Sequence, residues 1–324
     1  MKEPFLELKV SILNVKVTSW LFKIKMYFGR LFNRNVWVYY PWVGFSWGKV
    51  QDLNFGDDLN VSFLSKLTKD VLLPGCYYCN SPWGTRIGFP WMKGHKRITC
   101  IGSVLHTIEY DNTVVWGSGL LTEKHLPTHK LDIKAVRGPL TRKVLLEHGF
   151  DCPEVYGDPA LLLPYFYKPV KQKKRYKLGI VPHYSDMDKE ELEQFRSNPD
   201  VLIIPMTRYG TYKSVIDQIC SCDVIASSSL HGLIISEAYG IPNVWIEIKE
   251  PLFGDEDRRF KFHDFFLSIG CDRGCPIILS NQISLQDLLS QKLYCSRNNI
   301  SLECLELLIK SCPLNLKNKE FFGI

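Results

Sequence analysis

The 324-residue sequence has no long apolar run and little excess charge. Its longest stretch without a charged residue, residues 71–85, contains Pro74 and Gly75 and is shorter than the ~18 apolar residues of a membrane-spanning helix. Charged residues also interrupt the N-terminus, so no signal peptide is predicted. The net charge of +6 is too small for a dedicated nucleic-acid binder. We therefore expect a cytoplasmic globular protein without a membrane-spanning helix.

Motifs of several large enzyme classes are also missing. The sequence has no GxxxxGK[ST] or HExxH, which excludes P-loop NTPases and zincins. Its eleven cysteines are odd in number and fit reduced thiols rather than a disulfide framework. The only CxxC pair is Cys76 with Cys79, for which a redox or zinc role stays an alternative. No cluster of acids or histidines has the spacing of metal ligands, so we expect no metal.

What the sequence does contain, from residue 36 onward, is an alternation of short apolar runs and helical segments, with turns rich in glycine or serine. This alternation predicts an α/β fold with parallel sheets. Residues 139–148 are predicted as a helix because Pro139 begins them and Gly149 follows, and residues 233–239 precede Gly240 in the same way. The predicted strands are residues 36–40, 98–102, 113–116, 178–181, 201–204, 224–226 and 244–248.

A basic segment divides the chain. Residues 168–177 carry six bases and no acid, and such a segment cannot bury an apolar face, which predicts a linker. We therefore expect an N-terminal segment of residues 1–35, a first Rossmann-like domain of residues 36–167 and a second of residues 178–324. Two such domains would leave a cleft between the carboxyl ends of their sheets, where α/β folds bind ligands.

The N-terminal segment has an amphipathic pattern. Residues 19–34, drawn as a helix, place apolar side chains on one face and basic ones on the other. The pattern is typical of a helix in a membrane interface and equally of one packed on the protein, and residues 6–12 alternate as a strand would. Residues 1–34 hold seven bases and two acids. With the basic linker, they would attract an anionic cytoplasmic leaflet at ~1 kcal/mol per nearby base, which predicts a peripheral protein on the inner face of the cytoplasmic membrane.

Two loops in the first half carry candidate site residues. Asn54 and Gly56 precede Asp57, where the glycine permits close backbone approach and the aspartate is either a helix cap or a base. Arg137 directly precedes a helix N-terminus, which suits a phosphate or carboxylate and equally a solvated surface arginine. Gly117 belongs to a GSG that lacks the third glycine of a dinucleotide-binding motif.

Two loops in the second half add hydroxyls, imidazoles and cations. Residues 227–232, SSSLHG, lie between a predicted strand and helix and combine free amides, hydroxyls and His231, which suits phosphate binding and proton donation. A structural histidine at a helix start is the alternative. Residues 258–264 place Arg258, Arg259 and Lys261 among aromatic residues, either to close over an anion or as a solvated basic turn.

Seven segments in a fixed order resemble the polysaccharide pyruvyl transferase family over residues 36–270. This resemblance implies a GT-B-like fold of two Rossmann-like domains facing each other across a cleft. It also implies transfer of the enolpyruvyl unit of phosphoenolpyruvate to two hydroxyls of a sugar, with no cofactor beyond that donor. The segments are NFGD at 54–57, WGSG at 116–119, VRGPLT at 136–141, YGDPALL at 156–162, IVPH at 180–183, SSSLHGLIISEAYGIP at 227–242 and KFHDF at 261–265.

The same resemblance implies residue roles. It places Arg137, Leu230 and His231 on phosphoenolpyruvate, with Lys261 on the phosphate and Asp57 near the reacting centre. Relatives often have arginine where this chain has Ser229. We expect Ser229 to contact the donor, and Lys261 or its neighbours Arg258 and Arg259 to replace the lost anion contact. The chemistry calls for a general acid, assigned to His231 with His183 as the alternative, and for a base, assigned to Asp57. Arg137 and the helix N-terminus would stabilise the leaving phosphate.

The acceptor implied by the resemblance is a hexose of a bacterial capsular polysaccharide or exopolysaccharide precursor. Galactose with a 4,6-ketal is our leading expectation, either free, polymeric or lipid-linked. A GT-B glycosyltransferase that uses a nucleotide-sugar is the main alternative, with Glu237 or Glu247 as the acid that would hold a ribose. A non-catalytic protein that binds carbohydrate or a partner at the membrane is a second alternative.

Overall fold

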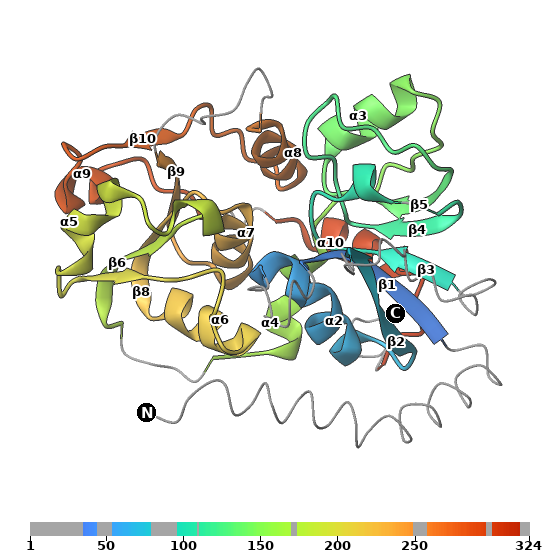
Figure 1. The fold of residues 1–324 in the computed structure, drawn as a ribbon, viewed down its shortest axis with the longest axis horizontal. Coiled ribbons are helices and arrows are strands. Elements are labelled where there is room, and N and C mark those ends of the chain that lie inside the picture. The colour runs from blue at the N-terminus through green and yellow to red at the C-terminus, as the bar shows by residue number, and fades with distance from the viewer. Residues whose placement is uncertain are drawn as a thin grey trace.

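The computed structural model describes residues 35–43, 54–78, 96–108, 110–169, 174–248, 258–295 and 300–317 (Figure 1). Within these ranges the chain builds two parallel sheets of five strands each. The expected amphipathic helix at residues 19–34 and the Cys79 half of the CxxC pair lie outside the described residues. No helix in the described ranges is long and apolar enough to cross a membrane.

The first sheet has the strand order β2-β1-β3-β4-β5. Its strands are β1 (Asn35–Val43), β2 (Val71–Tyr78), β3 (Lys96–Thr99), β4 (Thr113–Trp116) and β5 (Leu131–Ala135). The helical segments that accompany it are α2 (Phe55–Leu67), the 3-10 helix η2 (Leu105–Thr107), α3 (Pro139–Glu147), the 3-10 helix η3 (Pro159–Leu162) and α4 (Leu163–Phe166).

The second sheet has the strand order β10-β9-β8-β6-β7. Its strands are β6 (Tyr176–Val181), β7 (Val201–Ile203), β8 (Cys222–Ser227), β9 (Asn243–Ile248) and β10 (Ile277–Leu279). The helical segments that accompany or follow it are η4 (Tyr184–Asp186), η5 (Glu190–Leu192), α5 (Glu193–Arg196), α6 (Tyr212–Cys220), α7 (Leu230–Tyr239), α8 (Phe260–Ser268), α9 (Leu285–Leu289) and α10 (Leu302–Lys310).

Both sheets have the same topology when their strands are numbered within each sheet. Each has the order 2-1-3-4-5, which is that of doubly wound Rossmann-like folds of the flavodoxin type. The sequence therefore contains two copies of one architecture. In this order the chain reverses direction across the sheet between the first and third strands, and ligands of such folds bind outside the carboxyl ends of the strands at that point. In the second sheet these strands are β6 and β8. The predicted α/β fold with parallel sheets is confirmed.

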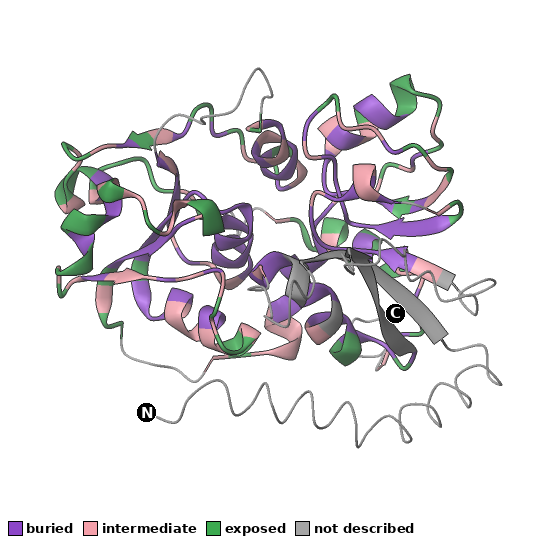
Figure 2. Ribbon diagram, in the orientation of Figure 1, coloured by how far each residue is buried: buried purple, intermediate pink, exposed green. Residues whose placement is uncertain are grey.

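The core is continuous between the elements of the two sheets. One cluster of buried side chains includes Phe55 and Leu59 of α2, Ile98 of β3 and Ile234 of α7. Figure 2 shows α7 buried along most of its length, and the residues from Leu230 to Ala238 are all buried. A helix buried on all sides fixes its N-terminal residues firmly, because every turn is packed against neighbours.

The described C-terminal residues return to the first sheet. Trp116 of β4 donates its indole N–H to the carbonyl of Leu308 in α10 at 2.8 Å. Leu316 forms an antiparallel bridge with Thr68, which follows α2. Residues 300–317 thus contact elements of the first sheet although they follow the second sheet in sequence. Of the expected linker, residues 170–173 lie outside the described part of the chain, and Tyr176 already begins β6.

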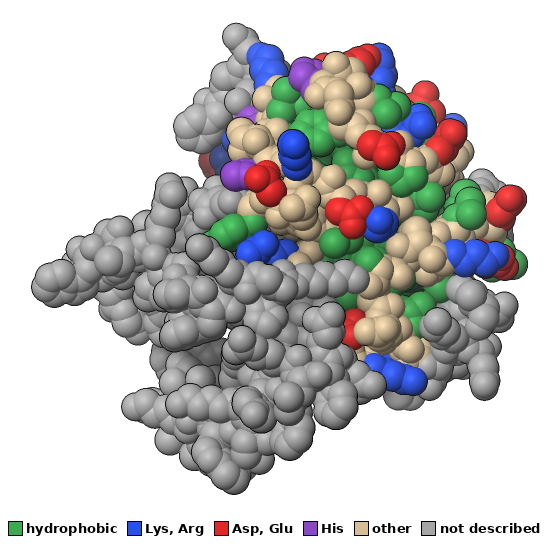
Figure 3. Space-filling view, turned by 90° about the vertical axis from the view of Figure 1, so that its right-hand side faces the viewer, with side chains coloured by type: hydrophobic (Ala, Val, Ile, Leu, Met, Phe, Trp, Pro, Cys, Tyr) green, Lys and Arg blue, Asp and Glu red, His purple; other side chains and the backbone are tan. Residues whose placement is uncertain are grey.

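Acidic and basic side chains are interspersed on the face shown in Figure 3. Ion pairs between exposed side chains include Lys134 with Asp132 and Lys143 with Glu147. Exposed pairs of this kind contribute ~0 to 1 kcal/mol each. The buried polar groups are therefore stronger candidates for a functional site than this surface.

Candidate active site

The serine-rich loop and His183 come together at the carboxyl ends of β8 and β6. The backbone N–H of His183, two residues after β6, donates to the hydroxyl of Ser228 at 2.9 Å. Ser228 in turn donates to Asp186 at 2.7 Å, and Ser227 accepts the N–H of Ser229 at 3.0 Å. These bonds shape the loop. Ser229, predicted to contact the donor, is the N-cap residue of α7, and Leu230 is its buried first helical residue.

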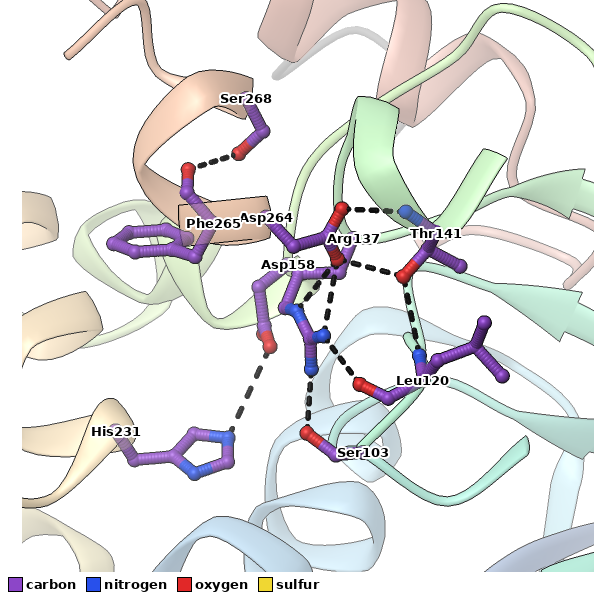
Figure 4. Close-up of polar contacts among 9 residues, drawn as sticks. All are labelled: Ser103, Leu120, Arg137, Thr141, Asp158, His231, Asp264, Phe265 and Ser268. Atoms are coloured by element: carbon purple, nitrogen blue, oxygen red, sulfur yellow. Dashed lines mark hydrogen bonds and ion pairs between the residues drawn. The ribbon is translucent and has the colours of Figure 1, made fainter. Parts of the chain in front are cut away.

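His231 is the second residue of α7, and its side chain is only 10% exposed. Its Nε2 lies 3.8 Å from Oδ2 of Asp158, and neither atom has a hydrogen-bond partner among the described residues (Figure 4). The other edge of the ring meets Gly56, where a Cβ would lie 2.1 Å from Nδ1. The close backbone approach expected at Gly56 is thus present. Burial, followed by the charges of Lys261 and Arg137, lowers the pKa of His231 to about 3.

Asp158 belongs to the YGDPALL segment at 156–162, and the sequence assigned it no catalytic role. The structure places it before η3, where its Oδ1 accepts the N–H of Ala160 at 2.9 Å and caps that helix. Burial raises the pKa of Asp158 to about 7, although the bond from Ala160 and the charge of Arg137 act in the opposite direction. The sequence did offer one signal for Asp158. It is an aspartate directly before Pro159, where a helix can begin, and an acid in such a loop is a candidate site residue.

Arg137 is fully buried and is held by protein groups (Figure 4). Its Nε donates to Oδ2 of Asp264 in α8 at 3.0 Å, Nη2 to the carbonyl of Leu120 at 2.7 Å and Nη1 to Ser103 at 2.5 Å. Asp264 also accepts the backbone N–H of Thr141, in the first turn of α3, at 2.8 Å. The guanidinium therefore joins the loop after β5 to α8, and its charge still reaches His231 and Asp158.

The glycines of the GSG segment make room for this arrangement. Gly117 has a φ of +96°, and a Cβ there would lie 2.2 Å from Cδ of Pro159, next to Asp158. A Cβ on Gly119 would lie 2.5 Å from the guanidinium carbon of Arg137. Both glycines thus allow close packing around the buried polar groups, which explains their presence without a nucleotide.

The remaining cations fall into two groups. Lys261 and Arg258 act on His183, whose pKa is lowered to about 3 by burial first and then by these charges and His231. Lys261 also acts on the pKa of His231. Arg259 instead pairs with Glu247 through two hydrogen bonds of 2.9 and 2.7 Å.

The two acids proposed for a ribose are both engaged by arginines. Glu247 accepts both bonds from Arg259, and buried Glu237 pairs with Arg273 and accepts from Asn243 at 2.8 Å. A ribose would have to displace an arginine at either acid, which disfavours the nucleotide-sugar alternative at these positions.

Residues 54–57 begin α2. Asn54 is the N-cap residue and makes no side-chain cap hydrogen bond, and the N–H of Phe55 donates to the carbonyl of Met206 at 2.8 Å. Asp57 lies in the first turn of α2, not at its cap, and its side chain is outside the described part of the structure. Among the described residues, no three His, Cys, Asp or Glu side chains are grouped to hold a metal ion.

Comparison with known protein families gives a match over the region that holds His231, Asp158 and Arg137. A family model for polysaccharide pyruvyl transferase matches residues 35–250, which is more than half of the chain. The protein belongs to the polysaccharide pyruvyl transferase family. The resemblance is confirmed over residues 35–250, which include six of the seven sequence segments, and the protein is accordingly a transferase of polysaccharide biosynthesis.

Two relatives are similar over most of the chain. The uncharacterized protein L143 of Acanthamoeba polyphaga mimivirus is 28% identical over 246 residues, which cover 74% of this chain and 80% of that protein. The succinoglycan biosynthesis protein ExoV of Rhizobium meliloti (strain 1021) is 26% identical over 225 residues, or 67% of this chain. The match spans 62% of ExoV, less than two thirds of its length.

Proposed function

We propose that this protein transfers the enolpyruvyl unit of phosphoenolpyruvate to two hydroxyls of a hexose and releases phosphate. The observation that carries the proposal is the buried imidazole of His231 at the start of α7, with Lys261 and Arg137 near enough to act on its pKa. An acid and cations at one point are what the reaction needs, because a proton must reach the donor while a phosphate dianion departs.

The proposed reaction proceeds in four steps. His231 donates a proton to C3 of the donor, and C2 becomes electrophilic. A sugar hydroxyl attacks C2 and gives its proton to Asp57. The bond from C2 to the phosphate oxygen then breaks, with the electron pair leaving on phosphate. The second hydroxyl attacks C2 and closes the ketal. Two hydroxyl protons are released and one is consumed at C3, so the other leaves with phosphate.

The burial of Arg137 refines its proposed role. Its Nε, Nη1 and Nη2 already donate to Asp264, Ser103 and Leu120, so a bidentate clamp on phosphate would break existing bonds. We assign it a contribution through its charge and through the placement of Asp264. Lys261 and Arg258 then supply the direct cations, with the N-terminus of α7 and Ser229 beside them.

The proposed arrangement is that of a GT-B fold. The donor would bind at the carboxyl ends of β6 and β8, and the acceptor would enter from the side of the first sheet across a cleft. The repeated strand order and the approach of Asp158 to His231 support this. As acceptor we propose galactose, as a 4,6-ketal, in a capsular or exopolysaccharide precursor. A lipid-linked acceptor would suit a peripheral membrane location mediated by residues 1–34.

The test is donor consumption by the full-length protein. Phosphate release from phosphoenolpyruvate is measured with galactosides and lipid-linked oligosaccharides as acceptors, and mass spectrometry identifies the ketal. We expect His231→Ala to lose turnover by at least ~10²-fold with the fold intact, and His129→Ala, at an exposed site, to behave as wild type. Normal turnover of His231→Ala would contradict the assignment. Thermal stabilisation by nucleotide-sugars but not by phosphoenolpyruvate would favour the glycosyltransferase instead.

A further inference from the structure

Two buried polar atoms face each other without a partner. Oδ2 of Asp158 and Nε2 of His231 are 3.8 Å apart, and their side chains are 1% and 10% exposed. Neither has a hydrogen-bond partner among the described residues. Leaving a buried polar atom unpaired costs about 1–3 kcal/mol. Two such atoms that face each other therefore indicate that a hydrogen bond forms between them during function. A hydrogen bond between them needs an approach of about 1 Å.

Both groups are held in place from their other side. Oδ1 of Asp158 is fixed by the N–H of Ala160 at 2.9 Å. The ring of His231 rests on Gly56, and α7 around it is buried. The two side chains come from different parts of the fold: Asp158 lies between α3 and η3, and His231 follows β8 at the start of α7.

We propose that Asp158 is the positioning residue of His231: the protonation state of its carboxyl sets which ring nitrogen carries the imidazole hydrogen. When Asp158 is protonated, Oδ2 donates to Nε2, and the hydrogen of the neutral ring lies on Nδ1. When Asp158 loses its proton to solvent, the ring hydrogen moves to Nε2 and is donated to the carboxylate. The link to catalysis rests on the proposed function, whereas the tautomer exchange does not.

The surrounding charges favour this assignment. His231 is faced by Lys261 from α8, by Arg137 from the loop after β5 and by His183 from the loop after β6. These groups are basic, so a second proton on the ring is disfavoured. Asp158 is faced by Arg137 and by the buried thiol of Cys100 after β3. Among these described groups around His231 and Asp158, the carboxyl of Asp158 is the only carboxylic acid that can share a proton with the imidazole.

The absence of a side chain at Gly56 fits the same scheme. Nδ1 is the ring nitrogen turned away from Asp158, and a Cβ at Gly56 would lie 2.1 Å from it. Glycine at this position leaves room for the ring, which any larger residue would displace. In the proposed reaction the proton given to C3 of the donor would come from Nδ1, so the active form is the one in which Asp158 is protonated. As Nδ1–H is given up, Oδ2–H passes to Nε2, and the ring stays neutral.

The test is nitrogen NMR of the histidine side chains in the full-length protein, with His231 assigned by loss of its signals in His231→Gln. We expect the ring hydrogen to move from Nδ1 to Nε2 as the pH rises through neutrality. In Asp158→Asn we expect one tautomer at every pH. Asp217→Asn is the matched control, because Asp217 is a hydrogen-bonded carboxylate in α6, remote from His231, and it should keep the exchange.

Two results would overturn the inference: a single pH-independent tautomer in the wild type, or persistence of the exchange in Asp158→Asn. The wild-type measurement tests the inference even if Asp158→Asn does not fold. In pyruvyl-transfer assays we expect the wild-type rate to fall as the pH rises through neutrality, and Asp158→Asn to lose that dependence and about 10²-fold in kcat. If the exchange is present and no pyruvyl transfer occurs, the proposed function fails while the pair stands.

Discussion

Arg137 and Asp264 form a fully buried ion pair in which Nε and Nη2 both lie 3.0 Å from Oδ2. The same carboxylate accepts the backbone N–H of Thr141 at 2.8 Å and its hydroxyl at 2.7 Å, and thereby caps α3. Gly138 makes this approach possible, since a Cβ there would lie 1.9 Å from the carbonyl oxygen of Asp264. One carboxylate of α8 therefore fixes both the arginine and the helix that follows it.

Removing that carboxylate should be costly. In Asp264→Ala the guanidinium of Arg137 stays buried without its counter-charge, so we expect the free energy of unfolding to fall by about 3–5 kcal/mol. Denaturant unfolding measures the change. The control is Asp132→Ala, whose pair with Lys134 is exposed and whose loss should cost ~0.5 kcal/mol. Equal losses in the two variants would show that burial does not decide the strength of the pair.

The contact of Gly56 with His231 predicts a non-additive double mutant. Gly56→Ala adds a Cβ that would lie 2.1 Å from Nδ1, so the variant should be destabilised and the imidazole displaced. In a His231→Ala background the clash is absent, and Ala then favours α2 by up to ~1 kcal/mol over glycine. Unfolding free energies of both single variants and the double variant measure the coupling. Additive effects would mean that the imidazole does not rest on Gly56.

The raised pKa of Asp158 predicts a pH dependence of stability. In the unfolded chain this carboxyl has its ordinary pKa of 3.8, and in the folded protein its pKa is about 7. Between these values the folded state binds the extra proton, so the contribution is present at low pH and is lost as the pH rises towards 7. Asp158→Asn lacks this loss. Its unfolding free energy relative to wild type should therefore increase between about pH 4 and about pH 7 and then level off.

Chemical denaturation of both proteins across that range provides the measurement. Asp217→Asn again serves as the control and should show no such trend relative to wild type. A constant difference between Asp158→Asn and wild type would indicate that the Asp158 carboxyl titrates normally in the fold.

The cations of residues 258–261 should differ in their effect on the donor. Lys261 acts on both imidazoles, whereas the guanidinium of Arg259 is held by Glu247. We expect Lys261→Gln to raise the KM for phosphoenolpyruvate by about 10-fold and Arg259→Gln to raise it much less. Steady-state kinetics at constant ionic strength compares them. Because Lys261 lowers the pKa of His183, its removal should also raise that pKa, which NMR titration can follow.

Strands with continuous apolar runs could be predicted well. Residues 113–116 were predicted as a strand and are β4, and residues 244–248 coincide with β9 except at its first residue. The strands that were missed are β2, β5 and β10, which lie at sheet edges. Edge strands need less apolar sequence: β5 reads LDIKA, and β2 contains Pro74, which cannot donate to a neighbouring strand.

For the site, the sequence by itself determined the family, the parallel α/β architecture and the position of His231 at a strand-to-helix turn, because these depend on local order and spacing. The pairing of His231 with Asp158, the burial of Arg137 against Asp264 and the contact of His231 with Gly56 were decided by the tertiary structure. These residues lie far apart in the chain, and a side chain's burial and partners depend on which loops the two sheets bring together. The motif identifies His231 as a candidate acid, but only the packing of the fold brings the carboxyl of Asp158 to its ring.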